Sequence, residues 1–126
     1  MYTMKKTAEL TGLSEHTLRY YDKEGLLPGL ARDGVGRRVF SDEDLRSIRT
    51  IQALREMGVP IARIRDFIAA GRGERGLERR GEIIAERMAR AKAELEALEE
   101  QIKLLARAAE YFRGAQAGRA DATLAA

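Results

Sequence analysis

Residues 3–25, TMKKTAELTGLSEHTLRYYDKEG, contain two short helical patterns separated by a tight turn. Thr3 can cap the first helix, and Gly12 can adopt the left-handed conformation that ends it. Ser14 can cap the second helix, which we expect to end at Gly25. Two short helices joined in this way form a helix-turn-helix, whose second helix ordinarily enters the major groove of DNA. Small helical bundles contain the same arrangement, so the flanking residues must distinguish a DNA-binding domain from a plain helical bundle.

The stretch after the second helix changes to residues that favour strands. Glycines punctuate residues 30–40, and the stretch ends with Val39 and Phe40. This pattern predicts a small β-hairpin with its tip at residues 33–36. It carries three arginines, whose guanidinium groups suit a phosphate backbone: Arg32, Arg37 and Arg38. A solvated loop is the alternative, but the two helices before it favour a DNA-binding wing.

Two further helices follow the hairpin. Ser41 and Asp44 form a capping-box pattern that begins the third helix, and Pro60 begins the fourth. Apolar residues recur at helical spacing in both and are expected to form the core: Leu45, Ile48, Ile51, Leu54, Ile61, Ile64, Phe67 and Ile68. Residues 71–76 are glycine-rich and are interpreted as a flexible connector. We therefore predict a winged helix-turn-helix domain over residues 1–75.

The rest of the chain carries a heptad pattern of apolar residues with alternating four- and three-residue spacing. Its members are Ile84, Met88, Ala91, Leu95, Leu98, Ile102, Leu105, Ala109 and Phe112. Such a helix either folds back onto its own domain or pairs with a second copy. A helix of about 30 residues is roughly 45 Å long, more than the small domain can cover. We therefore predict a dimerisation helix over residues 76–113, followed by a flexible tail at 114–126.

Composition excludes several classes of function. The 126 residues include no cysteine and one histidine, His16, so we expect no metal site, no cofactor and no enzymatic activity. No apolar run is long enough to span a membrane and no secretory signal is visible, so cytoplasmic residence is expected. The net charge is +3, and residues 1–75 hold 14 basic against 11 acidic residues, whereas the remainder holds 9 of each. This mild basic bias is compatible with a nucleic-acid partner.

Several motifs occur together in one order. TLRYYDKEGLLP at 17–28 and RVFSDEDL at 38–45 are followed by LREMG at 54–58 and IARI at 61–64. With the long terminal helix, they resemble the MerR family of transcription regulators over residues 2–113. The resemblance implies a mainly α fold, in which a winged helix-turn-helix precedes an antiparallel coiled-coil dimerisation helix.

The resemblance also implies roles for individual residues. Residues 14–23 would form the major-groove element, in which Tyr21 would contact phosphate while packing inward. Arg32 and Arg38 would hold the DNA backbone, and Arg37 stands where the family commonly has tyrosine, replacing a packing contact with charge. The DNA-binding residues expected on these grounds are Ser14, His16, Thr17, Arg19, Tyr20, Tyr21, Lys23, Arg32, Arg37 and Arg38.

The family's usual mechanism is to distort a promoter. A homodimer bound to an overlong promoter spacer bends and untwists the double-stranded DNA for RNA polymerase when an effector binds. Metal-sensing members place cysteines around the end of the long helix, and none occurs here; multidrug-sensing members carry a large ligand domain where this sequence has residues 114–126. The effector would therefore be a non-thiol small molecule, or there would be none. The alternatives are an architectural or excisionase-like DNA-binding protein without effector, and a coiled-coil scaffold.

Overall fold

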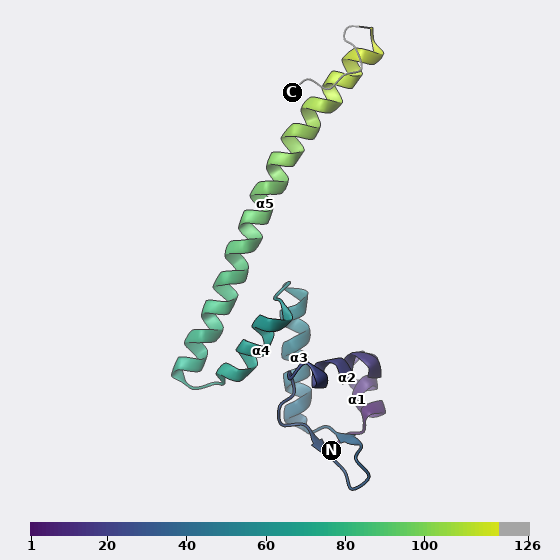
Figure 1. The fold of residues 1–126 in the computed structure, drawn as a ribbon, viewed down its shortest axis with the longest axis vertical. Helices are drawn as coiled ribbons and strands as arrows, with labels where there is room; N and C mark the ends of the chain where they lie inside the picture. Colours follow the sequence, from purple (N-terminus) through teal and green to yellow (C-terminus); the bar gives the residue numbers. More distant parts are fainter. Residues whose placement is uncertain (119–126) are drawn as a thin grey trace. The chain divides into compact units, whose positions relative to one another are not determined.

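The computed structural model describes residues 1–118, and these are mainly helical (Figure 1). The elements in order are α1 (Met4–Thr11), α2 (Glu15–Lys23), β1 (Ala31–Arg32), β2 (Arg38–Val39), α3 (Asp42–Glu56), α4 (Ile61–Ala70) and α5 (Glu74–Gln116). The chain divides into two compact units, of which the first is Met1–Arg87 and the second begins at Met88. The mainly α winged fold with a small hairpin and a long terminal helix, predicted from the sequence, is confirmed.

Side-chain caps begin the first three helices as predicted. The Thr3 hydroxyl accepts a hydrogen bond from the Lys6 backbone N–H at 3.0 Å, and the Ser14 hydroxyl accepts one from Thr17 at 3.1 Å. Ser41 and Asp44 form the complete capping box, with bonds of 3.1 Å and 2.8 Å between each side chain and the other residue's backbone N–H. These bonds satisfy amide groups that have no partner within the helix, which fixes where each helix begins.

One apolar core holds the first unit together. α1 packs against α2 and α3, and α3 packs against α4. The predicted core residues of α3 are all buried, as are Leu18 and Tyr21 of α2 and Ile64 of α4. Phe40, at the end of the hairpin, is fully buried among them. The core therefore fixes α2 and the hairpin onto one scaffold.

The hairpin is antiparallel, with Ala31 opposite Val39 and Arg32 opposite Arg38. Its base is tied to the start of the chain, because Tyr2 and Phe40 exchange backbone hydrogen bonds of 2.7 and 2.8 Å. The Tyr2 hydroxyl also donates to Asp42 at 2.7 Å, and this bond raises the pKa of Tyr2. The N-terminal residues thus act as a third short segment beside the wing.

The connector predicted at residues 71–76 is shorter than expected. α5 already begins at Glu74, and Gly76 is buried. A Cβ atom at Gly76 would lie 2.3 Å from the Ala70 carbonyl oxygen and 2.5 Å from that of Gly71. Glycine at this position therefore permits a close approach of two backbones, and the prediction of a flexible linker is wrong for residues 74–76.

The first turns of α5 belong to the first unit. Ile83 is only 1% exposed and lies in the core, and Ile84 packs against the core from its edge. Gly76, Arg80, Ile83 and Arg87 follow one another at four- and three-residue spacing, so they form a single helix face. Arg80 donates to the Phe67 carbonyl oxygen at 2.9 Å, and Arg87 donates to that of Met57 at 2.9 Å. This face anchors the start of α5 to α4 and to the end of α3.

At its other end, α5 continues to Gln116. Residues 114–116, which the sequence assigned to the tail, are therefore helical, because extending an existing helix by a residue costs far less than nucleating one. The remainder of the predicted tail from residue 119 lies outside the described residues.

Replacing Gly76 with alanine is expected to lower the free energy of unfolding by about 1 to 3 kcal/mol, because the added methyl group would overlap two backbone oxygens. The matched control is Gly81→Ala in the same helix, where nothing lies within 4 Å of the added Cβ. Gly81→Ala should raise stability by about 0.5 to 1 kcal/mol through helix propensity. Urea denaturation measures both changes, and two stabilising substitutions would show that the approach at Gly76 is not tight.

Candidate nucleic-acid interface

The exposed side of α2 meets the wing in one shallow depression. His16, Arg19, Tyr20 and Lys23 of α2 line it together with Arg38 of β2. Four of these five side chains are basic or ionisable to a cation, and the fifth is aromatic. The structure thus brings together five of the ten residues that the sequence proposed for DNA binding.

Three other residues that were proposed for DNA binding, in α2 and its N-cap, make contacts within the fold. The Ser14 hydroxyl caps the helix and lies 3.0 Å from the Thr17 hydroxyl. Tyr21 is only 2% exposed, and its ring packs in the core with the Arg55 guanidinium 6.0 Å from the ring centroid. Ser14 and Thr17 still lie at the helix N-terminus, where backbone N–H groups favour an anion.

Asp22, which the sequence analysis did not single out, joins the recognition helix to the wing. Its carboxylate accepts a hydrogen bond from the Arg38 Nε at 2.7 Å and lies 3.9 Å from a terminal nitrogen of Arg32. The Asp22 and Arg38 side chains are both partly buried, so water screens this pair less than it screens a fully exposed one. This carboxylate therefore orients Arg38 and lies within ion-pair distance of Arg32 on the facing strand.

The tip of the wing is organised by Asp33. Its carboxylate accepts hydrogen bonds from the backbone N–H groups of Val35 and Arg37 at 3.0 and 2.9 Å. The bond from the Arg37 backbone is the main reason that the pKa of Asp33 is lowered. The Arg37 side chain extends across the tip to Asp33 at 3.2 Å, and Arg32 donates to the Gly36 carbonyl oxygen at 2.7 Å. Arg37 therefore stabilises the turn through an ion pair with Asp33.

The far end of α2 is held by α4. Arg65 donates through Nε to the Glu24 carbonyl oxygen at 2.7 Å and through a terminal nitrogen to the Glu24 carboxylate at 3.0 Å. Positive charge is favourable at this helix C-terminus, where the backbone carbonyls are unpaired. α2 is therefore fixed at both ends, by its own cap at Ser14 and by Arg65.

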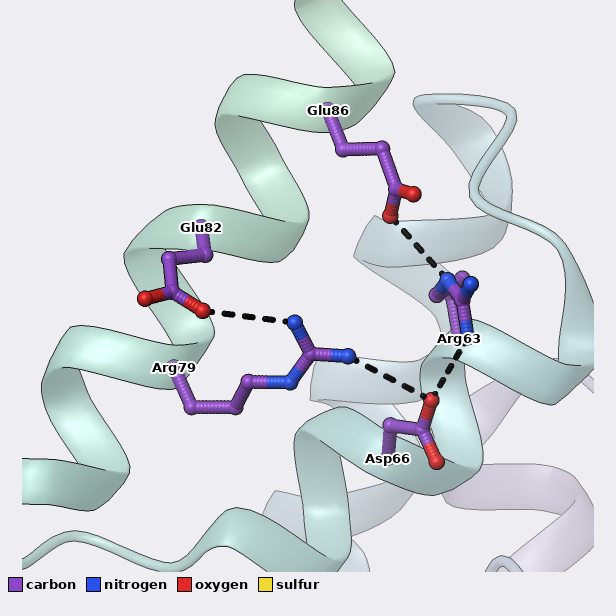
Figure 2. A network of polar contacts seen from close by, with 5 residues as sticks. All are labelled: Arg63, Asp66, Arg79, Glu82 and Glu86. Atoms are coloured by element: carbon purple, nitrogen blue, oxygen red, sulfur yellow. Dashed lines mark hydrogen bonds and ion pairs between the residues drawn. The ribbon is translucent and has the colours of Figure 1, made fainter.

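Figure 2 shows an ion-pair network between α4 and the first turns of α5. Arg63 forms hydrogen-bonded ion pairs with Asp66 at 2.9 Å and with Glu86 at 3.0 Å, and Arg79 forms ion pairs with Asp66 at 3.7 Å and with Glu82 at 3.3 Å. The hydrogen bond to Asp66 is the main cause of the raised pKa of Arg63. The network strengthens the attachment of α5 to the same scaffold that carries α2.

The predicted seam of α5 is largely exposed in the single chain. Its large side chains beyond Ile84 are between 40% and 67% exposed: Met88, Leu95, Leu98, Ile102, Leu105 and Phe112. Ala91 and Ala109 are exposed as well. Ile84 differs from them, since it already packs against the core of the first unit.

Two kinds of feature are absent from the described part of the chain. Residues 1–118 contain no group of three histidine, aspartate or glutamate side chains placed to hold a metal ion. None of the described helices is long and apolar enough to cross a membrane.

Asp22→Ala is expected to lower the free energy of unfolding by about 1 to 2 kcal/mol, because it leaves the half-buried Arg38 without its acceptor. It should also raise amide hydrogen exchange in residues 31–39. The control is Glu9→Ala, which removes an exposed pair with Lys6 at 3.9 Å and should change stability by less than about 0.5 kcal/mol. Equal exchange rates in Asp22→Ala and wild type would show that Asp22 does not hold the wing against α2.

Comparisons with known proteins agree with this geometry. The model of the MerR HTH family regulatory protein matches residues 2–71. An uncharacterized HTH-type transcriptional regulator of Haemophilus influenzae is 34% identical over 117 residues, which are 92% of this chain and 87% of that protein.

Two solved structures are similar over nearly the whole chain. HiNmlR, a MerR family regulator lacking the sensor domain and bound to promoter DNA, aligns with a TM-score of 0.61 and 34% identity over 92% of this chain and 93% of that one. A MerR family transcriptional regulator from Listeria monocytogenes aligns with a TM-score of 0.65 and 31% identity over 90% and 86%. The chain therefore belongs to the MerR family of helix-turn-helix DNA-binding transcription regulators.

Proposed function

We propose that this regulator binds promoter DNA sequence-specifically as a homodimer, with α2 in the major groove and the hairpin on the backbone. The observation that carries the proposal is the shared surface of α2 and Arg38, which is lined by basic and aromatic side chains. Among residues 1–118, Arg19 is paired only with the exposed Glu15 at 3.4 Å, so it can exchange this weak pair for a base edge. The solved DNA complex of the similar HiNmlR supports the assignment.

The hairpin is proposed to position the protein without reading sequence. Arg38 is held at its Nε by Asp22, which leaves its terminal amino groups for a phosphate. Contacts to phosphate fix register and orientation, whereas contacts to base edges carry the specificity. Arg32 and Arg37 are expected to add to the same electrostatic contact.

The homodimer is proposed to form through the seam of α5. Burying one fully exposed large apolar side chain gains about 1.5 to 3 kcal/mol. Six large apolar side chains lie along the seam of each chain, and each of them is about half exposed. Their combined burial in two copies is comparable to or larger than an association cost of about 4 to 15 kcal/mol. An antiparallel pairing is proposed by analogy with the family.

At the promoter, the dimer is proposed to distort an overlong spacer so that RNA polymerase can engage both promoter elements. Bending a site by tens of degrees costs about 1 to 6 kcal/mol, and an effector-linked coupling of about 1 to 3 kcal/mol covers the lower part of that range. The chain has no cysteine, so the proposed effector is a small molecule that acts without thiol chemistry.

Selection of bound duplexes from a random pool, followed by DNA-bending and transcription assays on the selected sites, tests this function. We expect a palindromic site whose half-sites are separated by whole helical turns. A selected site that is bent but leaves transcription unchanged would favour an architectural protein. Failure to enrich any sequence would contradict specific binding.

Arg19→Ala is expected to weaken operator binding by about 1 to 3 kcal/mol while changing binding to scrambled duplex little, as expected when a base contact is removed. Arg38→Ala should weaken binding to both duplexes. It should also reduce the steepness with which log affinity falls with log salt concentration, by about one for each phosphate that the variant no longer neutralises. Arg107→Ala, an exposed arginine of α5 away from the seam, is the control and should change neither. Titrations of each variant with both duplexes at several salt concentrations measure these affinities. If Arg19→Ala weakened binding to both duplexes equally, Arg19 would be a phosphate contact.

Leu98→Lys is expected to convert the dimer to monomers, because it places a charge in the middle of the apolar seam. Leu104→Lys is the matched control: Leu104 is similarly exposed but lies outside the four–three pattern. Light scattering measures the mass of each variant. A dimer that survives Leu98→Lys but not Leu104→Lys would place the interface on a different face of α5.

A further inference from the structure

A polar pocket lies within the first unit, apart from the DNA-binding surface. Its volume is about 430 Å³, which falls within the range of small-molecule sites. Its walls come from the loop after α2, the start of α3, the end of α4 and the first turns of α5. None of the ten proposed DNA-binding residues lines it.

One wall of the pocket carries two arginines. Arg72 follows α4 and Arg80 lies in α5. Arg80 is held in place, because its Nε donates to the Phe67 carbonyl oxygen at 2.9 Å and its guanidinium carbon lies 4.5 Å from the centroid of the Phe67 ring. Among residues 1–118, neither Arg72 nor the terminal amino groups of Arg80 have a hydrogen-bonding or ion-pair partner. Two guanidinium groups are therefore available to one ligand.

The electrostatics of this wall favour an anion. Burial lowers the pKa of Arg80, and the positive charge of Arg72 lowers it further. A carboxylate or phosphate between the two guanidinium groups would relieve their repulsion and accept charge-assisted hydrogen bonds.

Another part of the pocket wall is acidic and polar. It is formed by the first turns of α3, with Glu43, Asp44, Ser47 and Thr50. The Asp44 carboxylate is used by the capping box, whereas Glu43 has no hydrogen bond or ion pair within the described residues. A ligand that reaches this wall needs a cationic or hydrogen-donating group.

We propose that this pocket binds a small zwitterionic molecule, with its carboxylate or phosphate on Arg72 and Arg80 and its amino group on Glu43 and the α3 hydroxyls. The pocket wall includes residues 27–29, the loop that leads from α2 into the wing. A bound ligand would therefore stiffen the connection between the two DNA-contacting elements. This effect on the DNA-contacting elements rests on the proposed function, whereas the binding of the zwitterion does not.

The test uses the full chain and three probes at constant ionic strength. Phosphoethanolamine and γ-aminobutyrate carry an amino group with a phosphate or a carboxylate, and succinate carries two carboxylates. We expect amide chemical-shift changes confined to the pocket walls, with a Kd of about 1 mM or lower for at least one zwitterion. The stronger of the two identifies the anionic group. No such changes with either zwitterion, or succinate binding as tightly as they do, would overturn the proposal.

Variants separate a built site from general charge effects. Arg72→Ala should weaken zwitterion binding by about tenfold, the reduction expected for one charge-assisted hydrogen bond. Arg75→Ala removes an exposed arginine that does not line the pocket and should leave the Kd unchanged. Glu43→Gln should weaken the zwitterions but not succinate. Equal weakening by Arg72→Ala and Arg75→Ala would overturn the site.

A DNA titration with and without the tighter-binding zwitterion then tests the link to regulation. We expect the affinity for the selected operator to change in wild type but not in Arg72→Ala. Unchanged affinity despite binding would overturn the regulatory part. If the protein binds the zwitterion but no DNA sequence, the proposed function fails while the pocket assignment stands.

Discussion

The approach of two backbones at Gly76 is the constraint on which the first unit depends. The start of α5 can lie against the end of α4 only because position 76 has no side chain to separate them. This contact allows Ile83 to reach the core and the arginines at 80 and 87 to bond to carbonyl oxygens of neighbouring segments. The hydrophobic core of the DNA-binding unit is therefore completed by a helix that also carries the proposed dimer seam.

A second constraint acts at the DNA-binding surface, where positive charge must be both abundant and ordered. Arginine side chains lose much rotamer freedom when they are held in one position, and a carboxylate partner offsets this cost. Asp22 does so for the wing at the expense of one local positive charge. The arrangement favours accurate placement of few guanidinium groups over a larger but mobile cluster. This agrees with a net charge of only +3 for the whole chain.

Features that depend on neighbouring residues could be predicted from the sequence, whereas pairings across the fold could not. The caps at Thr3, Ser14 and Ser41 and the turn at Gly12 have local signatures, and the structure contains each of them. The bond between Asp22 and Arg38 spans 16 residues and depends on the register of the hairpin, which no local pattern specifies. Glycine permits both mobility and close packing, and the sequence alone does not distinguish these two roles at Gly76. The sequence pattern does not predict a core position for Ile83, because the heptad that begins at Ile84 accounts for the apolar residues around it.

Ile83 and Ile84 show how one helix can serve two surfaces. Adjacent residues on a helix point about 100° apart, so one can enter the core while the next remains at its edge. Ile84 occupies this edge and is also the first member of the seam pattern. A change in how the proposed seam pairs near Ile84 would therefore alter packing at the edge of the core, and the ion pairs of Arg63 and Arg79 join α4 to these same first turns of α5. Arg65 of that same α4 holds the end of α2, so α4 makes direct contacts both with the first turns of α5 and with the recognition helix. Closely packed contacts of this kind have few alternative arrangements, so a shift at one end is more easily passed on than absorbed.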